Sequence, residues 1–197
     1  VENSFINYFS KKTEIYKGMK LIDEKLGGTT PLEVILKLSK KKELAVDKED
    51  DFEDWGEEEG KNDDKYWFTK DKIDKRANVH NYLDSLPQVG KVLSFSSIID
   101  IATLLNNNKP LGTLEMGVLY SKIPKSIKTE IIDPYISIKD NEARINLRII
   151  DSQENLRRND LIKKINYDLK NKLNLKEDEY KLAGVLILFN NLLQSLF

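Results

Sequence analysis

The most regular alternation of apolar and polar residues lies near the middle of the C-terminal half. Residues 143–150 alternate throughout, and residues 135–138 alternate before a polar turn at residues 139–142. Because successive side chains of a strand point to opposite faces, this pattern predicts a β-hairpin with one apolar face. The apolar face of its second strand carries Ile145, Leu147 and Ile149, and the solvated face carries Arg144, Asn146 and Arg148.

Other segments show the three- and four-residue spacing of apolar positions that is typical of amphipathic helices. They are residues 4–10, 12–26, 71–86, 96–105 and 156–173. In the second of these, the apolar stripe predicts a helix that faces the core and ends at the two glycines that follow it. Neighbouring lysines leave a helix on a membrane surface as the alternative. The stripe consists of Ile15, Met19, Ile22 and Leu26.

Three further short segments, residues 32–38, 89–95 and 180–185, have the composition of strands. The chain order is then strand, helix, strand, helical insertion, hairpin, helix, strand. Two βαβ-like halves predict an α+β, two-layer fold of the ferredoxin-like split βαβ type, with helical insertions. We expect the first two strands to run parallel in one sheet, helices to cover one face, and the other face to be polar or covered by a partner.

The apolar residues between Leu111 and Ile132 are expected on short helical pieces, broken at Gly112, Gly117 and Pro124. Their favoured interpretation is core packing against the sheet. A cleft that binds a hydrophobic ligand is the alternative, because methionine and aromatic side chains suit adaptable apolar sites.

Three regions follow from these elements. Residues 1–28 are expected to form a helical lead-in, and residues 29–185 are expected to form the α/β domain with an acidic insertion at residues 40–65. Residues 186–197 begin a helix, within an apolar run too short and too polar to span a membrane. The first residue is not methionine and no signal segment is visible, so we expect a piece of a longer chain.

Charge is distributed unevenly along the chain. The net charge is −1, which gives no argument for nucleic acid as a partner. Residues 47–64 contain eleven acidic residues and two lysines, which leaves the remainder near +8. Such a run is typical of a solvated insertion, and it lacks the register of a calcium-binding loop. The aromatic residues 66–68 are expected to return the chain to the fold as a short strand or an anchor.

The candidate chemistry is sparse. The chain contains no cysteine, which excludes disulfides, thiolate catalysis and cysteine metal sites. His80 is the single histidine and has no interpretable nucleophile or carboxylate partner in the sequence, so we interpret it as structural. We therefore predict no catalytic, cofactor-binding or metal-binding residues, no cofactor and no enzymatic activity; substrate-path residues cannot be assigned from the sequence.

Three segments resemble one family. They are SFINYFSKKTEIYKGMKLIDEKLGGTTPLEVIL within residues 3–36, VHNYLDSLPQVGKVLSFSSIIDIATLLN at residues 79–106, and GVLILFNNLLQSLF at residues 184–197. They are similar to the first periplasmic loop, between membrane helices one and two, of predicted exporters of the RND superfamily, of the MMPL and hopanoid-exporter type. The acidic insertion departs from the family pattern.

The resemblance implies a porter-type periplasmic domain of a proton-driven bacterial inner-membrane transporter. It also implies that the lead-in at residues 1–28 is membrane-proximal and that the helix beginning at residues 186–197 leads toward the next membrane span. Its substrates would be hydrophobic or amphiphilic small molecules such as lipids, hopanoid-like compounds or drugs. Its partners would be the membrane helices and second periplasmic loop of the same chain, and a homo-oligomer is compatible with this class. The residues that carry protons would lie in membrane helices outside this sequence.

Two interpretations of function remain open. In the first, the domain contributes to the substrate path of the exporter, and Gly27-Gly28 connects the lead-in helix mechanically to the first strand. In the second, the domain recruits protein partners through residues 43–64 and has no direct role in transport.

Overall fold

The computed structural model describes residues 5–38, 67–153 and 156–195. The predicted acidic insertion at residues 40–65 lies outside the described residues.

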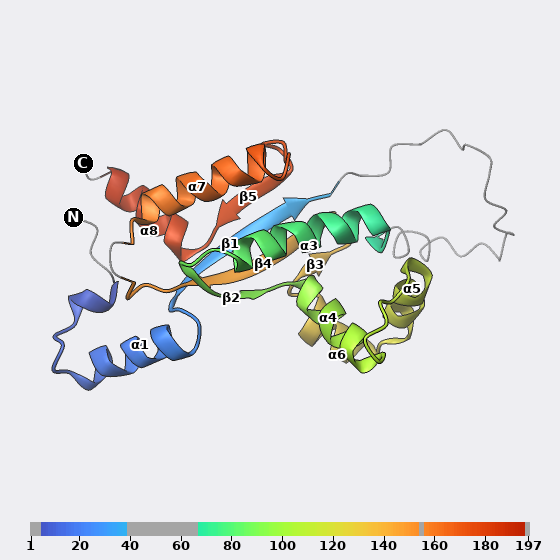
Figure 1. The fold of residues 1–197 in the computed structure, drawn as a ribbon, viewed down its shortest axis with the longest axis horizontal. Coiled ribbons are helices and arrows are strands. Elements are labelled where there is room, and N and C mark those ends of the chain that lie inside the picture. Colours follow the sequence, from blue (N-terminus) through green and yellow to red (C-terminus); the bar gives the residue numbers. More distant parts are fainter. Residues whose placement is uncertain (1–4, 39–66, 154–155, 196–197) are drawn as a thin grey trace, which may run out of the picture.

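The described residues form an antiparallel sheet in which the strand order is β2–β4–β1–β5, with β3 paired to β4 (Figure 1). This is the strand order of the predicted ferredoxin-like fold, and the α+β fold class is confirmed. The first two strands run parallel, as expected, but β4 lies between them and pairs antiparallel with each. The strands are β1 (Thr30–Lys37), β2 (Val89–Leu93), β3 (Ile136–Ser137), β4 (Glu142–Ile149) and β5 (Tyr180–Ala183).

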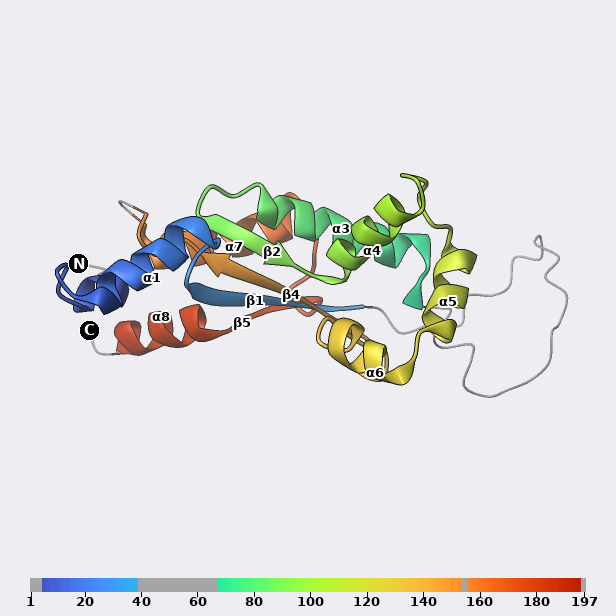
Figure 2. The ribbon, with the colours of Figure 1, turned by 90° about the horizontal axis from the view of Figure 1, so that it is seen from below.

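Helices lie on both sides of this sheet in Figure 2, with α3, α4 and α7 on one side and α6 and α8 on the other. A 3-10 turn, η1, precedes α1, and a π-helical turn, η2, follows α6. The helical elements are η1 (Phe5–Tyr8), α1 (Glu14–Lys25), α3 (Lys70–Asp84), α4 (Phe95–Leu105), α5 (Thr113–Lys122), α6 (Lys125–Ile127), η2 (Lys128–Ile132), α7 (Arg158–Asn171) and α8 (Val185–Ser195). None of the helices in the described ranges is both long enough and apolar enough to cross a membrane.

The core lies between one face of the sheet and helices α3 and α7. The predicted apolar positions of β4 are buried opposite those of β1, where Leu32 faces Leu147 and Val34 faces Ile145. A hydrogen bond from the Tyr82 hydroxyl to Asp168 Oδ2, at 2.7 Å, ties α3 to α7. Burial, together with this carboxylate, raises the pKa of Tyr82, so the hydroxyl remains a donor at neutral pH.

The opposite face of the sheet carries polar side chains, but α6 and α8 lie on its side, so the expectation that helices cover one face alone was wrong. Arg144 Nε lies 3.6 Å from Glu33 Oε2 on the neighbouring strand, and both side chains are partly exposed. The exposed cationic residues of this face are Lys37, Lys91, Arg144, Arg148 and Lys181. The two arginines predicted on a solvated face therefore lie on one.

Some details of the helices differ from expectation. The stripe of α1 that was predicted to face the core is largely exposed, with Ile15 at 57% and Leu26 at 60%. Its buried residue is Asp23, because polar contacts and not apolar packing attach this helix to the sheet. Gly117 lies inside α5 and does not break it, and α4 begins at Phe95 because Ser94 provides the N-cap.

Candidate functional site: an apolar cavity beside a buried arginine

The helical insertion formed by α4, α5, α6 and η2 lies at one end of the sheet (Figure 1). An aromatic cluster joins it to the start of α3. The ring of Phe68 lies 5.8 Å from that of Phe95 and 5.1 Å from that of Tyr120, centroid to centroid. Tilted pairs at these distances are favourable arrangements of aromatic rings.

A cavity of about 40 Å³ lies between this insertion and Phe68. All lining side chains are apolar apart from the Tyr120 hydroxyl: Phe68, Phe95, Ile98, Ile99, Ala102, Leu111, Met116, Leu119, Tyr120, Ile123 and Ile132. The segment between Leu111 and Ile132, for which the sequence left core packing and a ligand cleft as alternatives, contributes six residues to the cavity lining, and three of these are also buried core residues. Met116 and Ile132 are buried, whereas Leu119 lines the cavity and is 45% exposed.

A buried arginine adjoins the cavity. Arg76 of α3 is 2% exposed, and its guanidinium carbon lies 5.1 Å from the ring centroid of Trp67 and 5.2 Å from that of Phe95. The ring of Phe95 therefore contacts the arginine and also lines the cavity. Burial lowers the pKa of Arg76 to about 10, which still leaves the side chain charged at neutral pH. Lys72 Nζ lies 5.6 Å from the same indole, so two cations flank Trp67.

Two larger hollows lie on the surface of the described residues, and the one unpaired buried polar atom among their lining residues is Gln88 Oε1, in the hollow near the start of α7. The hollow between α7 and β5 measures about 530 Å³, but Lys170 and Glu177 on its wall pair with one another at 2.5 Å. The hollow near the start of α7 measures about 260 Å³, and Arg157 on its wall forms an exposed ion pair with Asp160. Neither resembles a site with a few polar groups converging on an apolar pocket.

The predicted mechanical joint at Gly27-Gly28 is a tightly packed contact. Both glycines have positive φ, 83° and 97°, a region that favours glycine. A Cβ atom on Gly28 would lie 2.5 Å from the carbonyl oxygen of Ile149, and one on Gly27 would lie 2.8 Å from that of Gly90. The end of α1 is thus held against the ends of β4 and β2 by backbone-to-backbone contact.

Asp23 reinforces this contact. Its carboxylate accepts hydrogen bonds from the Thr29 hydroxyl at 2.6 Å and from the amides of Asp151 at 2.9 Å and Ser152 at 2.7 Å. Burial alone would raise the pKa of Asp23, but these hydrogen bonds outweigh burial and lower the pKa below its ordinary value. We refer to Asp23, Gly27, Gly28 and their partners as the α1 clamp.

A second carboxylate extends the α1 clamp to the first helical turn of the chain and to α7. Asp151 forms a buried ion pair with Arg158, and its Oδ2 accepts a hydrogen bond from the Ile6 amide at 3.4 Å. A carboxylate that joins three segments in this way orders the region where they meet.

His80 is buried at the start of the helical insertion, where its Nδ1 lies 2.8 Å from Ser94 Oγ. Ser94 is 3% exposed, and its hydroxyl accepts a hydrogen bond from the Ser96 amide as the N-cap of α4. This pair holds α3 to the junction between β2 and α4, and the geometry supports the structural interpretation of His80. Within the described ranges, no group of three or more histidine, aspartate or glutamate side chains could hold a metal ion.

The sequence argument missed Arg76 and Asp23. A signal for Arg76 was present, because Lys72, Arg76, Val79 and Leu83 follow one another at spacings of four, three and four along one side of α3. Charged residues in register with an apolar stripe are candidates for burial. Asp23 had no comparable signal, since the two backbone amides that bind it belong to Asp151 and Ser152, which lie about 130 residues away in the sequence.

The comparisons with known proteins add no relative. No family model matches the chain, and neither a curated protein nor a solved structure was found to be similar.

Proposed function

We propose that this chain is the first periplasmic loop of a proton-driven RND-type inner-membrane transporter, and that it contributes to the path of exported hydrophobic or amphiphilic molecules. The proposal starts from the resemblance of residues 3–36, 79–106 and 184–197 to that family. The ferredoxin-like strand order is compatible with a porter-type domain.

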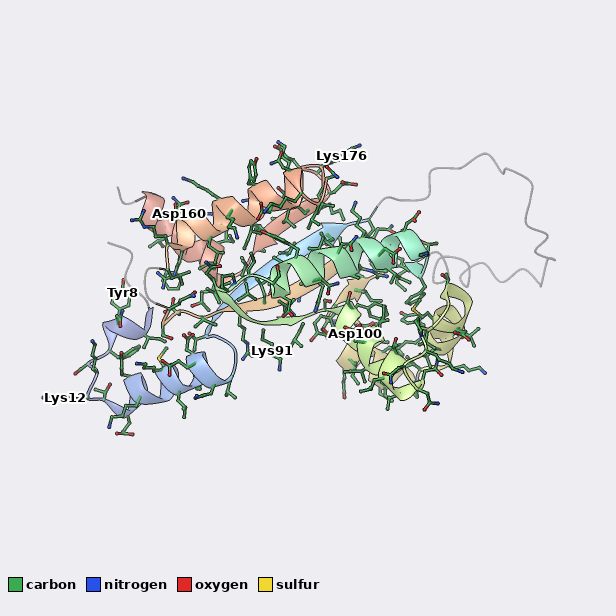
Figure 3. All side chains as sticks on the ribbon, viewed as in Figure 1. Tyr8, Lys12, Lys91, Asp100, Asp160 and Lys176 are labelled. Atoms are coloured by element: carbon green, nitrogen blue, oxygen red, sulfur yellow. The ribbon has the colours of Figure 1, made fainter. Side chains whose placement is uncertain are left out.

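The observation that carries the proposal is the placement of α1 and α8. Both helices lie at the same end of the molecule, and Figure 3 places Tyr8 and Lys12 there, away from Asp100 of the helical insertion. Each helix exposes apolar side chains, including Leu26 at 60% on α1 and Leu188 at 65% on α8. A loop between two consecutive membrane helices needs both of its ends on one side, with apolar surface close to the bilayer.

The cavity supports the second part of the proposal. Its lining is apolar and it opens at Leu119, which suits molecules that partition into apolar surroundings. It lies at the end of the sheet opposite the α1 clamp, so a ligand site and a connection to the membrane would occupy different ends of the domain (Figure 1).

The alternative function is a periplasmic interaction module without a direct role in transport. The eleven acidic residues within positions 47–64 favour it, because a dense charge run can recruit basic partners. Deleting residues 43–64 from the whole transporter separates the two functions. Export should persist if the substrate path is the function and should be lost if recruitment is.

The reading frame around the coding sequence provides the direct test. We expect strong membrane spans directly before residue 1 and directly after residue 197, with a second large loop in a duplicated architecture. In a strain that lacks the transporter, the whole chain should restore export of an amphiphilic dye. A reading frame without flanking spans would overturn the proposal.

A further inference from the structure

Two buried N–H donors beside the cavity have no acceptor. Arg76 donates from Nε to the Lys72 carbonyl oxygen at 3.0 Å and from Nη2 to the Trp67 carbonyl oxygen at 3.4 Å. Its third nitrogen, Nη1, and the indole Nε1 of Trp67 are both buried without a hydrogen-bond partner. Both belong to side chains that contact one another, because the Arg76 guanidinium carbon lies 5.1 Å from the centroid of the Trp67 ring.

Such donors are uncommon in folded proteins. Leaving a buried donor unsatisfied destabilises the folded state, and more so when the group is charged. Asp71 and Asp74 on the same helix are exposed, and among the described residues no carboxylate pairs with Arg76. The aromatic rings on either side stabilise the cation but accept no conventional hydrogen bond.

We propose that Arg76 and Trp67 bind the carboxylate of an amphiphilic ligand whose apolar chain enters the neighbouring cavity. A guanidinium group binds a carboxylate through parallel N–H donors, and the indole N–H adds a further one. The cavity begins at the Phe95 ring, which also contacts Arg76, so head and tail sites adjoin. This inference rests on the proposed function and deepens it, because it assigns the polar group that the domain recognises.

The size of the cavity restricts the ligand. A volume of about 40 Å³ accommodates only part of an alkyl chain, so α4 and α5 must separate slightly or the chain must continue over the surface. Leu119 lines the cavity and is partly exposed, so it marks where the chain would leave. A short amphiphile is therefore the appropriate probe.

Calorimetric titration of the 197-residue chain with octanoate, and separately with octanol, tests the proposal. We expect octanoate to bind about tenfold more tightly than octanol, because a charge-assisted pair adds roughly 1.5 kcal/mol or more. Arg76→Gln should abolish this preference. Arg148→Gln is the matched control, because it removes the same charge from the exposed face of the sheet and should keep the preference.

A second variant keeps the proposal testable if Arg76→Gln does not fold. Trp67→Phe keeps an aromatic ring but removes the indole donor, and it should weaken octanoate binding severalfold while leaving octanol binding unchanged. Equal affinities for the two probes in the wild-type chain, or a preference that survives both substitutions, would overturn the proposal.

A carboxylate from the acidic run at residues 47–64 could bind Arg76 and Trp67 in place of a ligand carboxylate. Replacing the eleven acidic residues of positions 47–64 by their amides should leave octanoate binding and its Arg76 dependence intact. Suppose instead that the chain binds octanoate and octanol equally, and that Arg76→Gln destabilises the wild-type chain but not the amide variant. The hydrogen-bond acceptor of Arg76 is then a carboxylate of the chain itself, and the proposal is wrong. Neither result affects the test of flanking membrane spans, so the two proposals fail independently.

Discussion

The α1 clamp and the buried arginine beside the cavity treat buried polar groups in opposite ways. In the α1 clamp, the Asp23 carboxylate accepts three hydrogen bonds, and glycine backbones fill the remaining space. At the cavity, Arg76 and Trp67 each retain a buried donor without an acceptor, and the apolar lining encloses empty volume.

This difference indicates a division of roles. Dense packing and satisfied hydrogen bonds give the clamp a defined geometry at the expense of adaptability. An unfilled cavity with unsatisfied donors lowers stability and is favourable only when something fills it. We therefore expect substitutions in the clamp to change stability with little effect on binding, and substitutions at the cavity to do the reverse.

The largest effect is expected for Gly28→Ala. Its Cβ would lie 2.5 Å from the Ile149 carbonyl oxygen at a φ of 97°, so the substitution should lower the free energy of unfolding by about 3 kcal/mol. Gly18→Ala is the matched control, because a Cβ there meets no atom within 4 Å and alanine should stabilise α1 by about 1 kcal/mol. Urea unfolding measures both. If Gly28→Ala changed the free energy of unfolding as little as Gly18→Ala does, the clamp would not be tightly packed.

Asp23→Asn should have the next largest effect, a loss of about 2 kcal/mol at pH 7, because a charged acceptor of three hydrogen bonds becomes neutral. Since the folded-state pKa of Asp23 is lowered, its contribution is complete above the unfolded-state pKa of about 4 and disappears as the pH falls further. The difference between wild type and variant should therefore be constant from pH 5 to 8 and shrink below pH 4. A difference independent of pH would exclude the carboxylate charge as its cause.

A smaller loss, about 1 kcal/mol, is expected for Ser94→Ala, which removes the N-cap of α4 and the hydrogen bond to His80. Ser121→Ala is the control, because its exposed hydroxyl bonds the Val118 carbonyl within the same helix. The midpoints of thermal unfolding of the two variants measure the difference. If Ser94→Ala also removed the preference for octanoate, the start of α4 would belong to the binding site.

The smallest effect on stability is expected for Ala102→Met, which extends a cavity-lining side chain into empty volume. The free energy of unfolding should change by less than about 1 kcal/mol, whereas octanoate affinity should fall about tenfold because the tail site is occupied. Leu105→Met, on the same helix but 80% exposed, should change neither quantity. Unchanged octanoate binding in Ala102→Met would place the tail elsewhere.

Sequence reasoning predicted the sheet well because its information is local. Alternation identified the faces of β4, and the order of elements specified the arrangement β2–β4–β1–β5. It failed for α1, since an apolar stripe indicates that a helix is amphipathic but not what covers it. Residue patterns also did not show which apolar residues enclose the cavity or which glycines meet another backbone. Those properties depend on contacts between segments far apart in the chain.

The central strand β4 connects the α1 clamp to the end of the sheet where the cavity lies, so it would transmit a force applied at one end to the other. Its last residue, Ile149, contacts Gly28 in the α1 clamp, and its first residues pair with β3, which follows the cavity-lining Ile132 of η2. Eight residues of extended chain span about 26 Å. A hydrogen-bonded strand resists changes in length. A displacement of α1 along the axis of β4 would therefore be transmitted almost fully to the helical insertion at the other end of the strand. Strand β4 is therefore a direct mechanical connection between the α1 clamp and the helical insertion that encloses the cavity.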